Sequence, residues 1–190
     1  MQKLLLHSCC GPCSSAVLER LVEEYDVTVL YYNPNIQPQA EYEKRKAEQL
    51  RLIAEVYPQV GVLDCDYCAN DYITAVRGLE KEKEGGARCK VCFELRLRYC
   101  AQKAKQNNFD IFATTLSVSP YKNAELINQI GLNLQSEIGI NYLVSDFKKK
   151  NGYLRSIELA KKYNLYRQNY CGCMYSYYEA EEYRKSKGIK

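Results

Sequence analysis

Short apolar runs alternate with helical patterns along this chain, and the alternation predicts its secondary structure. Runs rich in leucine, β-branched or aromatic residues predict five strands, at residues 3–8, 26–32, 60–65, 110–115 and 141–147. Apolar positions recurring at helical spacing, with Pro38 and Pro58 as boundary signals, predict seven helices, at residues 14–25, 38–56, 70–79, 91–106, 122–137, 153–163 and 176–187.

Strands that alternate with helices at this spacing form parallel βαβ units. We therefore expect a three-layer α/β sandwich with a mostly parallel, five-stranded Rossmann-like (HUP-like) sheet and C-terminal helices. In such sheets the loops that follow the strands gather along one edge, where ligands bind. Five of the ten cysteines fall in these loops: Cys9, Cys10, Cys13, Cys65 and Cys68.

The length of 190 residues and an apolar content of 46% predict one domain, 1–190, with a substantial core. No apolar run is long enough for a secretory signal or a membrane span, so we expect a cytoplasmic protein with no membrane partner. In a reducing compartment, ten grouped cysteines indicate metal binding or redox chemistry rather than a disulfide framework.

The net charge of +4 is concentrated near the C-terminus. Residues 141–190 hold 11 Lys and Arg, five Asp and Glu, and nine of the 18 tyrosines. Cations neutralise phosphates and aromatic rings stack on unpaired bases, so the basic, Tyr-rich segment 146–190 is a candidate RNA surface. The alternative is a solvated, lysine-rich helical end.

The segment HSCCGPCS, residues 7–14, occupies the first βα turn, where a glycine-rich phosphate loop would otherwise stand. No GxGxxG or Walker A pattern occurs in the chain, so a soft-metal site is the better candidate. Because Cys9 and Cys10 are adjacent, we expect their thiols on different sides of the chain, which would suit a cluster better than a single ion.

The segment CKVC places Cys89 and Cys92 one turn apart near the start of a predicted helix. Together with Cys9 and Cys10 they give four ligands, the usual number for a [4Fe-4S] cluster or a structural zinc. Two further pairs are Cys65 with Cys68, in CDYC, and Cys171 with Cys173, in CGC, a separation that zinc sites seldom use. Cys100, in the middle of a predicted helix, is expected to be a small buried hydrophobe.

Five ordered blocks of the chain resemble the QueH-type epoxyqueuosine reductases. The blocks are HSCCGPCS (7–14), YYNPNIQPQAEYEKR (31–45), GARCKVCFELRL (86–97), FDIFATTLSVSPYKN (109–123) and DFKKKNGYLRSIELAKKYNLYRQNYCGC (146–173). The resemblance implies reduction of the epoxide of epoxyqueuosine at the tRNA wobble position, which gives queuosine in the last step of its biosynthesis. It also implies a tRNA partner and an external electron donor.

The resemblance further implies a [4Fe-4S] cluster on Cys9, Cys10, Cys89 and Cys92, and a redox-active disulfide between Cys171 and Cys173. A further metal ion, iron or zinc, is implied beside the cluster. Its candidate ligands, chosen by position alone, are Cys13, Cys65, Cys68 and Asp146. The basic segment would contact the anticodon loop of tRNA through Lys148, Lys149, Lys150, Arg155, Arg167 and Tyr170.

Epoxide reduction to an alkene takes two electrons and two protons and releases water, so the leaving oxygen needs an acid or a Lewis acid. Tyr121, Asp146 and Asp64 are candidate proton donors in the predicted site loops, where SPYKN (119–123) also lies. His7, the only histidine, is expected to be a core or loop-bracing residue.

Three alternative functions use the same residues. A non-catalytic, zinc-stabilised RNA-binding module would use the cysteines structurally. An iron-sulfur tRNA thiolation enzyme would need an ATP-binding SGGxDS loop after the first strand, and HSCCGPCSS stands there instead. A thiol-disulfide oxidoreductase is disfavoured because the CxxC pair lacks a thioredoxin-like context.

Overall fold

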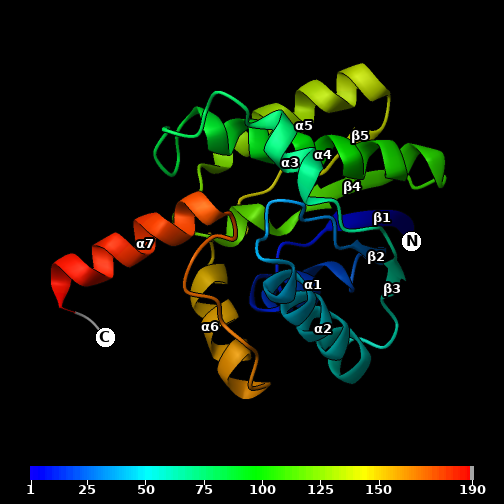
Figure 1. The fold of residues 1–190 in the computed structure, drawn as a ribbon. Helices are drawn as coiled ribbons and strands as arrows, with labels where there is room; N and C mark the ends of the chain where they lie inside the picture. Colours follow the sequence, from blue (N-terminus) through cyan, green and yellow to red (C-terminus); the bar gives the residue numbers. More distant parts are fainter. Residues whose placement is uncertain (189–190) are drawn as a thin grey trace.

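The computed structural model describes residues 1–188 and places a five-stranded sheet between two layers of helices (Figure 1). The strand order is β3-β2-β1-β4-β5, and all neighbouring strands are parallel. The strands are β1 (Gln2–His7), β2 (Tyr25–Leu30), β3 (Gly61–Leu63), β4 (Ile111–Thr114) and β5 (Asn141–Tyr142). The predicted three-layer α/β sandwich with its parallel sheet is confirmed.

Seven α-helices and one short 3-10 helix connect and follow the strands. They are α1 (Gly11–Leu21), α2 (Gln39–Val56), α3 (Ala69–Ala75), α4 (Ala87–Gln106), η1 (Thr115–Val118), α5 (Ala124–Ile138), α6 (Gly152–Lys162) and α7 (Met174–Lys187). Residues 189–190 of the predicted segment 146–190 lie outside the described residues.

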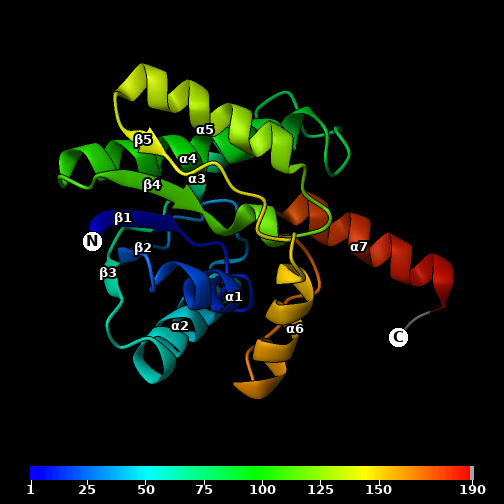
Figure 2. The ribbon, with the colours of Figure 1, turned by 180° about the vertical axis from the view of Figure 1, so that it is seen from behind.

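The central strand β1 is buried on both faces, and its side chains alternate between two cores. Leu4 and Leu6 pack against α1, α2 and α6, whereas Leu5 packs against α4 and α5. Figure 2 shows these two helical layers on opposite sides of the sheet. Burial on both faces explains why β1 is a continuous apolar run rather than an alternating one.

The strand order changes direction between β1 and β4, which lie side by side with His7 opposite Thr114. Loops that leave two such neighbouring strands diverge to opposite faces of the sheet and leave a crevice between them. The loop after β1 carries Cys9 and Cys10, and the segment after β4 is η1. The topology thus fixes where a site forms.

Two helices begin three or four residues earlier than the sequence predicted. α1 starts at Gly11 rather than Ser14, because Pro12 suits the first turn, where a backbone N–H would have no partner. α4 starts at Ala87 rather than Val91, since the carbonyl of Gly86 accepts from the N–H groups of Cys89 and Lys90. Cys13, Cys89 and Cys92 therefore lie within the first turns of helices.

The last strand is much shorter than predicted, since β5 ends at Tyr142 rather than residue 147. The chain leaves the sheet there because Asn128 on α5 binds both the N–H and the carbonyl of Ser145, at 3.1 and 3.0 Å. α5 itself begins at Ala124, capped by the side chain of Asn123, so Lys122 lies in the preceding loop rather than in the helix.

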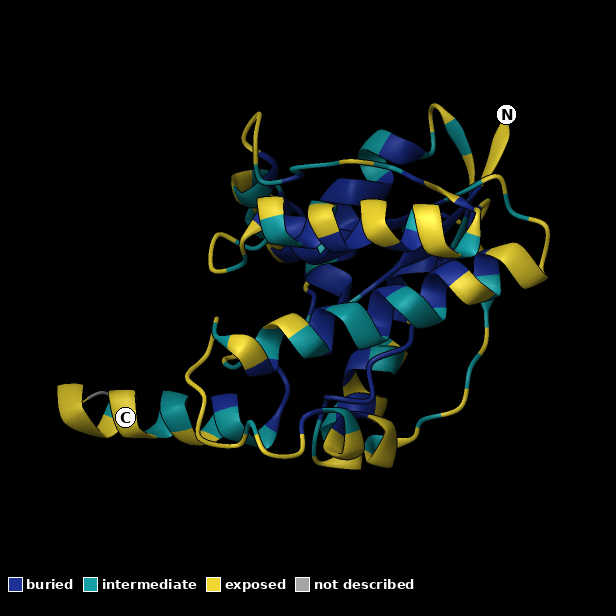
Figure 3. Ribbon diagram, turned by 90° about the horizontal axis from the view of Figure 1, so that it is seen from above, coloured by how far each residue is buried: buried dark blue, intermediate teal, exposed yellow. Residues whose placement is uncertain are grey.

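The C-terminal helix α7 extends away from the sheet (Figure 3). Of its residues, Met174–Lys187, only Ser176 in the first turn is buried. Within residues 1–188, no helix combines the length and apolar character needed to cross a membrane.

Candidate active site

Three thiols meet where β1 turns into α1. The sulfurs of Cys9 and Cys10 lie 3.9 Å apart, and those of Cys9, Cys10 and Cys13 all lie within 4.8 Å of one another. Three sulfur donors at this separation are close enough to bind a metal ion. The expectation that Cys9 and Cys10 point to different sides of the chain is therefore wrong.

The backbone explains this arrangement. Cys10 is the N-cap residue of α1 and has an extended conformation, with φ −175° and ψ 160°. The chain changes from strand to helix at this residue, so the alternation of a continuing strand no longer separates neighbouring side chains. Cys13 then returns to the same place after one helical turn.

The thiols of this group differ in acidity because they share protons. The pKa of Cys9 is lowered well below its usual value, chiefly by the neighbouring thiol of Cys10 and then by that of Cys13. Contacts with the thiol of Cys10 and then with that of Cys9 raise the pKa of Cys13. Thr115 also donates to the Cys9 sulfur at 3.4 Å, so Cys9 is the thiol of this group that ionises first.

The second cysteine pair lies in the first turns of α4. Cys89 accepts a hydrogen bond from the N–H of Gly85 at 3.2 Å, and burial raises the pKa of its thiol. Cys92 is 7% exposed, and burial raises its pKa to about 12. A metal that binds this pair must displace both protons, as thiolate ligation requires. Neither Cys89 nor Cys92 belongs to the group of thiols whose sulfurs lie within 4.8 Å of one another.

Cys171 and Cys173 precede α7, and all ten cysteines are free thiols in this structure. Cys173 is the N-cap of α7, and its sulfur accepts from the N–H of Ser176 at 3.4 Å. Cysteines thus stand at the N-termini of α1, α4 and α7, where the helix dipole favours a negatively charged sulfur.

The backbone around Cys171 is held by α2 and by the segment that leads into it. The carbonyls of Tyr170 and Cys171 accept from the guanidinium of Arg45, at 3.4 and 3.0 Å. The carbonyl of Gly172 accepts from the N–H of Gln37 at 2.9 Å. Three consecutive carbonyls are therefore fixed by residues far away in the sequence.

Arg96 is a buried cation that has no carboxylate partner among residues 1–188. Its Nε donates to the carbonyl of Cys92 at 3.2 Å, and its Nη2 has no hydrogen-bond partner. Burial opposes its charge, but the thiols of Cys92, Cys171, Cys9 and Cys89 outweigh this effect and raise its pKa. An arginine stays charged in proteins, so these sulfurs are the groups positioned to balance it.

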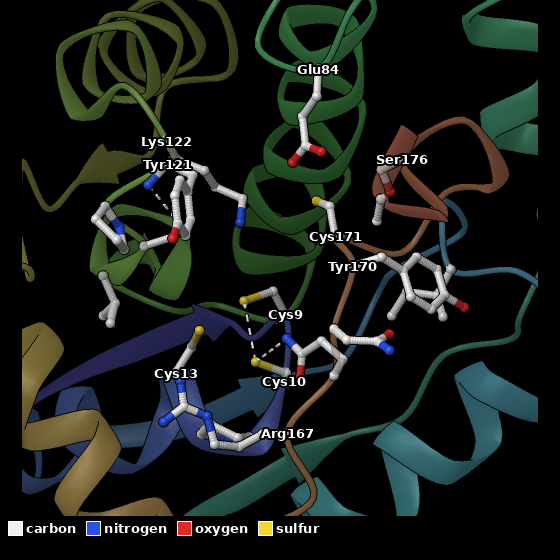
Figure 4. A pocket seen from close by; sticks show the side chains of 18 of the residues that line it. Cys9, Cys10, Cys13, Glu84, Tyr121, Lys122, Arg167, Tyr170, Cys171 and Ser176 are labelled. Carbon is white, nitrogen blue, oxygen red and sulfur yellow. Dashed lines mark hydrogen bonds between the residues drawn. The ribbon is translucent and has the colours of Figure 1, made fainter. Parts of the chain in front are cut away.

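A cavity of about 680 Å³ opens beside these thiols (Figure 4). Cys9, Cys10 and Cys13 lie together on one side of it, and Cys171, Lys122 and Glu84 lie around it. Gln168 also lines the cavity and donates to the Cys10 sulfur at 3.2 Å. The chemistry that this cavity can support is thiol or metal-thiolate chemistry on a ligand of nucleoside size.

The predicted RNA contacts occupy different environments. Arg167 and Tyr170 line the cavity. Arg155 is held by Glu19 and Glu158, with nitrogen–oxygen distances of 2.7 and 2.9 Å. Lys148 and Lys149 both face Asp146, at 3.5 and 3.6 Å, whereas Lys150 is exposed.

The candidate ligands of a second metal are only partly brought together. Cys13 joins Cys9 and Cys10, but within residues 1–188 neither Cys65, Cys68 nor Asp146 belongs to a group of three or more possible ligands. Cys65 donates to the carbonyl of Tyr31 at 3.4 Å, and Cys68 is exposed at the N-cap of α3.

His7 has the bracing position that the sequence suggested. It is buried, its Nε2 lies 3.0 Å from the carbonyl of Tyr32, and its Nδ1 lies 3.0 Å from the hydroxyl of Thr114. A carbonyl can only accept, so Nε2 carries the proton and Nδ1 accepts from Thr114. Burial, followed by the charge of Arg96, lowers its pKa to about 3, so the ring is neutral.

Four site residues were not predicted from the sequence: Arg45, Glu84, Arg96 and Gln168. Arg96 follows Cys92 by four residues and so shares its helix face, which is a usable signal. Arg45, Glu84 and Gln168 reach the site through tertiary packing, and no local pattern marks them.

Comparison with known proteins gives a consistent result. The family model described as "Epoxyqueuosine reductase QueH" matches residues 4–179. Proteins of that name are 46% identical in Streptococcus pyogenes (91% of this chain and 69% of theirs), 40% in Acinetobacter baylyi (98% and 85%) and 35% in Thermotoga maritima (96% and 94%). A predicted subunit of tRNA methyltransferase from Methanocaldococcus jannaschii has a similar fold, with TM-score 0.54, 15% identity and coverage of 85% and 75%.

Proposed function

The chain belongs to the epoxyqueuosine reductase QueH family, and on this basis we propose that it reduces epoxyqueuosine to queuosine at the wobble position of tRNA. The observation that carries the proposal is the cavity beside Cys9, Cys10 and Cys13, with Cys171 on its wall. A reducible group bound there meets sulfur from two distant segments of the chain.

We assign a [4Fe-4S] cluster to Cys9, Cys10, Cys89 and Cys92. The donor set fits this group, because thiolates are the usual ligands of such clusters. Arg96 fits it as well, since a buried guanidinium with an unpartnered Nη2 is balanced by an anionic metal-thiolate centre. When bound, the cluster would supply electrons one at a time. Cys13 is then available to a further metal ion, iron or zinc.

We assign Cys171 and Cys173 as a dithiol that becomes a disulfide during turnover. The conversion of two thiols to a disulfide releases two electrons and two protons, which is what an epoxide needs to give an alkene and water. An external donor then returns two electrons to the disulfide, and two protons from solvent restore the thiols. Because Gly172 is the only residue between the two cysteines, the disulfide would close a small ring, and strained disulfides are the readily reduced ones.

The cavity receives the modified nucleoside of the anticodon loop. Extrusion of this nucleoside from its stack exposes a flat base and two phosphates, which aromatic and cationic side chains bind. Arg167 and Tyr170 line the cavity beside the sulfurs and provide both kinds of contact.

The test is anaerobic purification followed by iron and sulfide analysis and an assay with tRNA that carries epoxyqueuosine. About four iron and four sulfide atoms per chain, with conversion to queuosine, support the proposal. Cys89→Ser should lose the cluster, and Cys68→Ser, an exposed cysteine, serves as the control that keeps it. A colourless protein that holds only zinc, even after reconstitution, would favour the alternative RNA-binding module.

A further inference from the structure

Lys122 stands on the wall of the cavity in the loop between η1 and α5. Its backbone is fixed on both sides. Its N–H donates to the carbonyl of Ser119 at 3.2 Å, and its carbonyl accepts from the ammonium of Lys148 at 3.1 Å. The next residue, Asn123, caps α5. The loop therefore fixes the backbone from which the Lys122 side chain extends.

The ammonium of Lys122 points into the cavity (Figure 4). Across the described part of the chain, no carboxylate lies within ion-pair distance of it, and no acceptor forms a hydrogen bond with it. By contrast, Lys46 is paired with Asp64 at 2.9 Å. Lys122 thus offers three N–H donors to whatever the cavity binds.

Its surroundings keep Lys122 charged. Burial opposes the charge, but the thiols of Cys171, Cys9 and Cys13 outweigh both burial and the nearby cation Arg96, so the pKa is raised. Two carboxylates of the described chain line the cavity with it: Glu84, whose own pKa is raised by burial, and Glu179, which pairs with Arg88 at 2.9 Å. An ammonium is therefore present in the cavity at neutral pH.

We propose that Lys122 donates a hydrogen bond, and then a proton, to the epoxide oxygen as its bonds to carbon break. The proposal rests on the reductase function proposed above. The two electrons come from the reductant of that reaction and form the C=C bond as both C–O bonds break. One proton on the oxygen comes from Lys122, the second comes from the thiols or water, and the oxygen leaves as water. Solvent then reprotonates the amine.

The three proton donors that the sequence suggested are less well placed. The side chain of Asp64 is 83% exposed and paired with Lys46. Asp146 faces Lys148 and Lys149 and does not line the cavity. Tyr121 lines the cavity but is 84% exposed, so it lies at the opening. Of these four candidate proton donors, all within the described residues, Lys122 alone is a charged group without an ion-pair partner inside the cavity.

The experiment compares wild type with Lys122→Ala, Lys122→Arg and Lys103→Met, a control lysine in the last turn of α4 that does not line the cavity. Three quantities are measured: iron content, affinity for the tRNA and the single-turnover rate at saturating tRNA. Lys122→Ala should keep the iron content and the tRNA affinity of wild type. Its single-turnover rate should be lower by a factor of about 10²–10⁴, the usual contribution of a general acid. Lys122→Arg should remain slow, since a guanidinium does not release its proton.

Chemical rescue separates proton donation from charge. Ethylamine should restore part of the rate of Lys122→Ala, whereas tetramethylammonium, which has the charge but no N–H, should not. Lys122→Met is the substitute if the alanine variant does not fold. A normal rate in Lys122→Ala, a defect in tRNA affinity alone, or equal rescue by both cations would overturn the proposal. An inactive wild-type protein would instead refute the reductase function.

Discussion

The guanidinium of Arg45 lies 3.0 Å from the carbonyl oxygen of Cys171, across 126 residues of sequence. Arg45 is buried, its charge is balanced by Glu41 at 2.7 Å, and its guanidinium also lies 4.9 Å from the ring of Tyr170. The backbone that carries the two proposed redox cysteines is therefore held by α2 as well as by the local hydrogen bonds of Ser176.

Arg45→Met should lower the rate of epoxide reduction and leave the iron content intact, because Cys171 is no longer held at the cavity. Each lost hydrogen bond from the charged guanidinium should reduce the free energy of unfolding by about 1.5–3 kcal/mol. Urea unfolding and single-turnover rates measure both effects. Arg98→Met is the control, because the ion pairs that it removes are partly exposed. It should reduce the free energy of unfolding by about 1 kcal/mol or less and leave the activity normal.

Gly172→Ala should impair reduction without loss of the cluster. Gly172 has φ +150°, and an added Cβ would lie 3.0 Å from both Asn35 and Ile36. We expect a loss of about 1–3 kcal/mol of stability, as for other strained backbone positions. Gly78→Ala is matched for positive φ, at +85°, but meets nothing within 4 Å, so it should reduce its substrate normally. Equal defects in both variants would show that backbone strain, and not the packing around the CGC segment, is responsible.

Arg96→Met should have opposite effects on the apoprotein and on the proposed cluster. Without metal, the wild-type guanidinium is a buried charge with no carboxylate beside it, so its removal should leave the apoprotein equally or more stable. The cluster should be retained less well, because its negative charge loses this cation. Arg88→Met is the control: Arg88 is also buried but pairs with Glu179 at 2.9 Å, so its loss should destabilise the apoprotein by about 1–3 kcal/mol. Destabilised apoprotein in both variants would contradict the assigned role of Arg96.

Arg167→Ala should weaken tRNA binding. It should also lower the slope of log K, the logarithm of the tRNA binding constant, against log salt concentration by about one, as expected for the loss of one phosphate contact. Arg155→Ala should change neither quantity, because Arg155 is already engaged by Glu19 and Glu158. Filter binding at several salt concentrations gives both values. If Arg155→Ala has the larger effect, tRNA lies over α6 rather than over the cavity.

The sequence predicted the order of strands and helices and the edge of the sheet where the site lies. Both follow from local patterns, since apolar runs and helical spacing depend on neighbouring residues. The same reasoning put Cys9, Cys10 and Cys13 at that edge. Their mutual distances could not be predicted, because they depend on the backbone angles of one residue, Cys10, at the change from strand to helix.

The charged residues of the site show the other limit. In sequence, Arg96 and Arg98 are two arginines on one helix, yet Arg96 is buried near four thiols and Arg98 lies at the surface. Likewise, Arg155 and Arg167 both looked like RNA contacts, but only Arg167 lines the cavity. Which partner a long side chain finds is decided by tertiary packing, and local patterns do not record it.

The most direct test of the proposed reductase function is the product formed from tRNA that carries epoxyqueuosine. The anaerobically purified protein and a chemical reductant are incubated with this tRNA. The tRNA is then digested, and its nucleosides are separated and identified by mass spectrometry. Epoxyqueuosine is expected to lose one oxygen atom and give queuosine with wild type and not with Cys171→Ser. Unchanged epoxyqueuosine in the presence of protein with a full iron-sulfur content would contradict the proposed function.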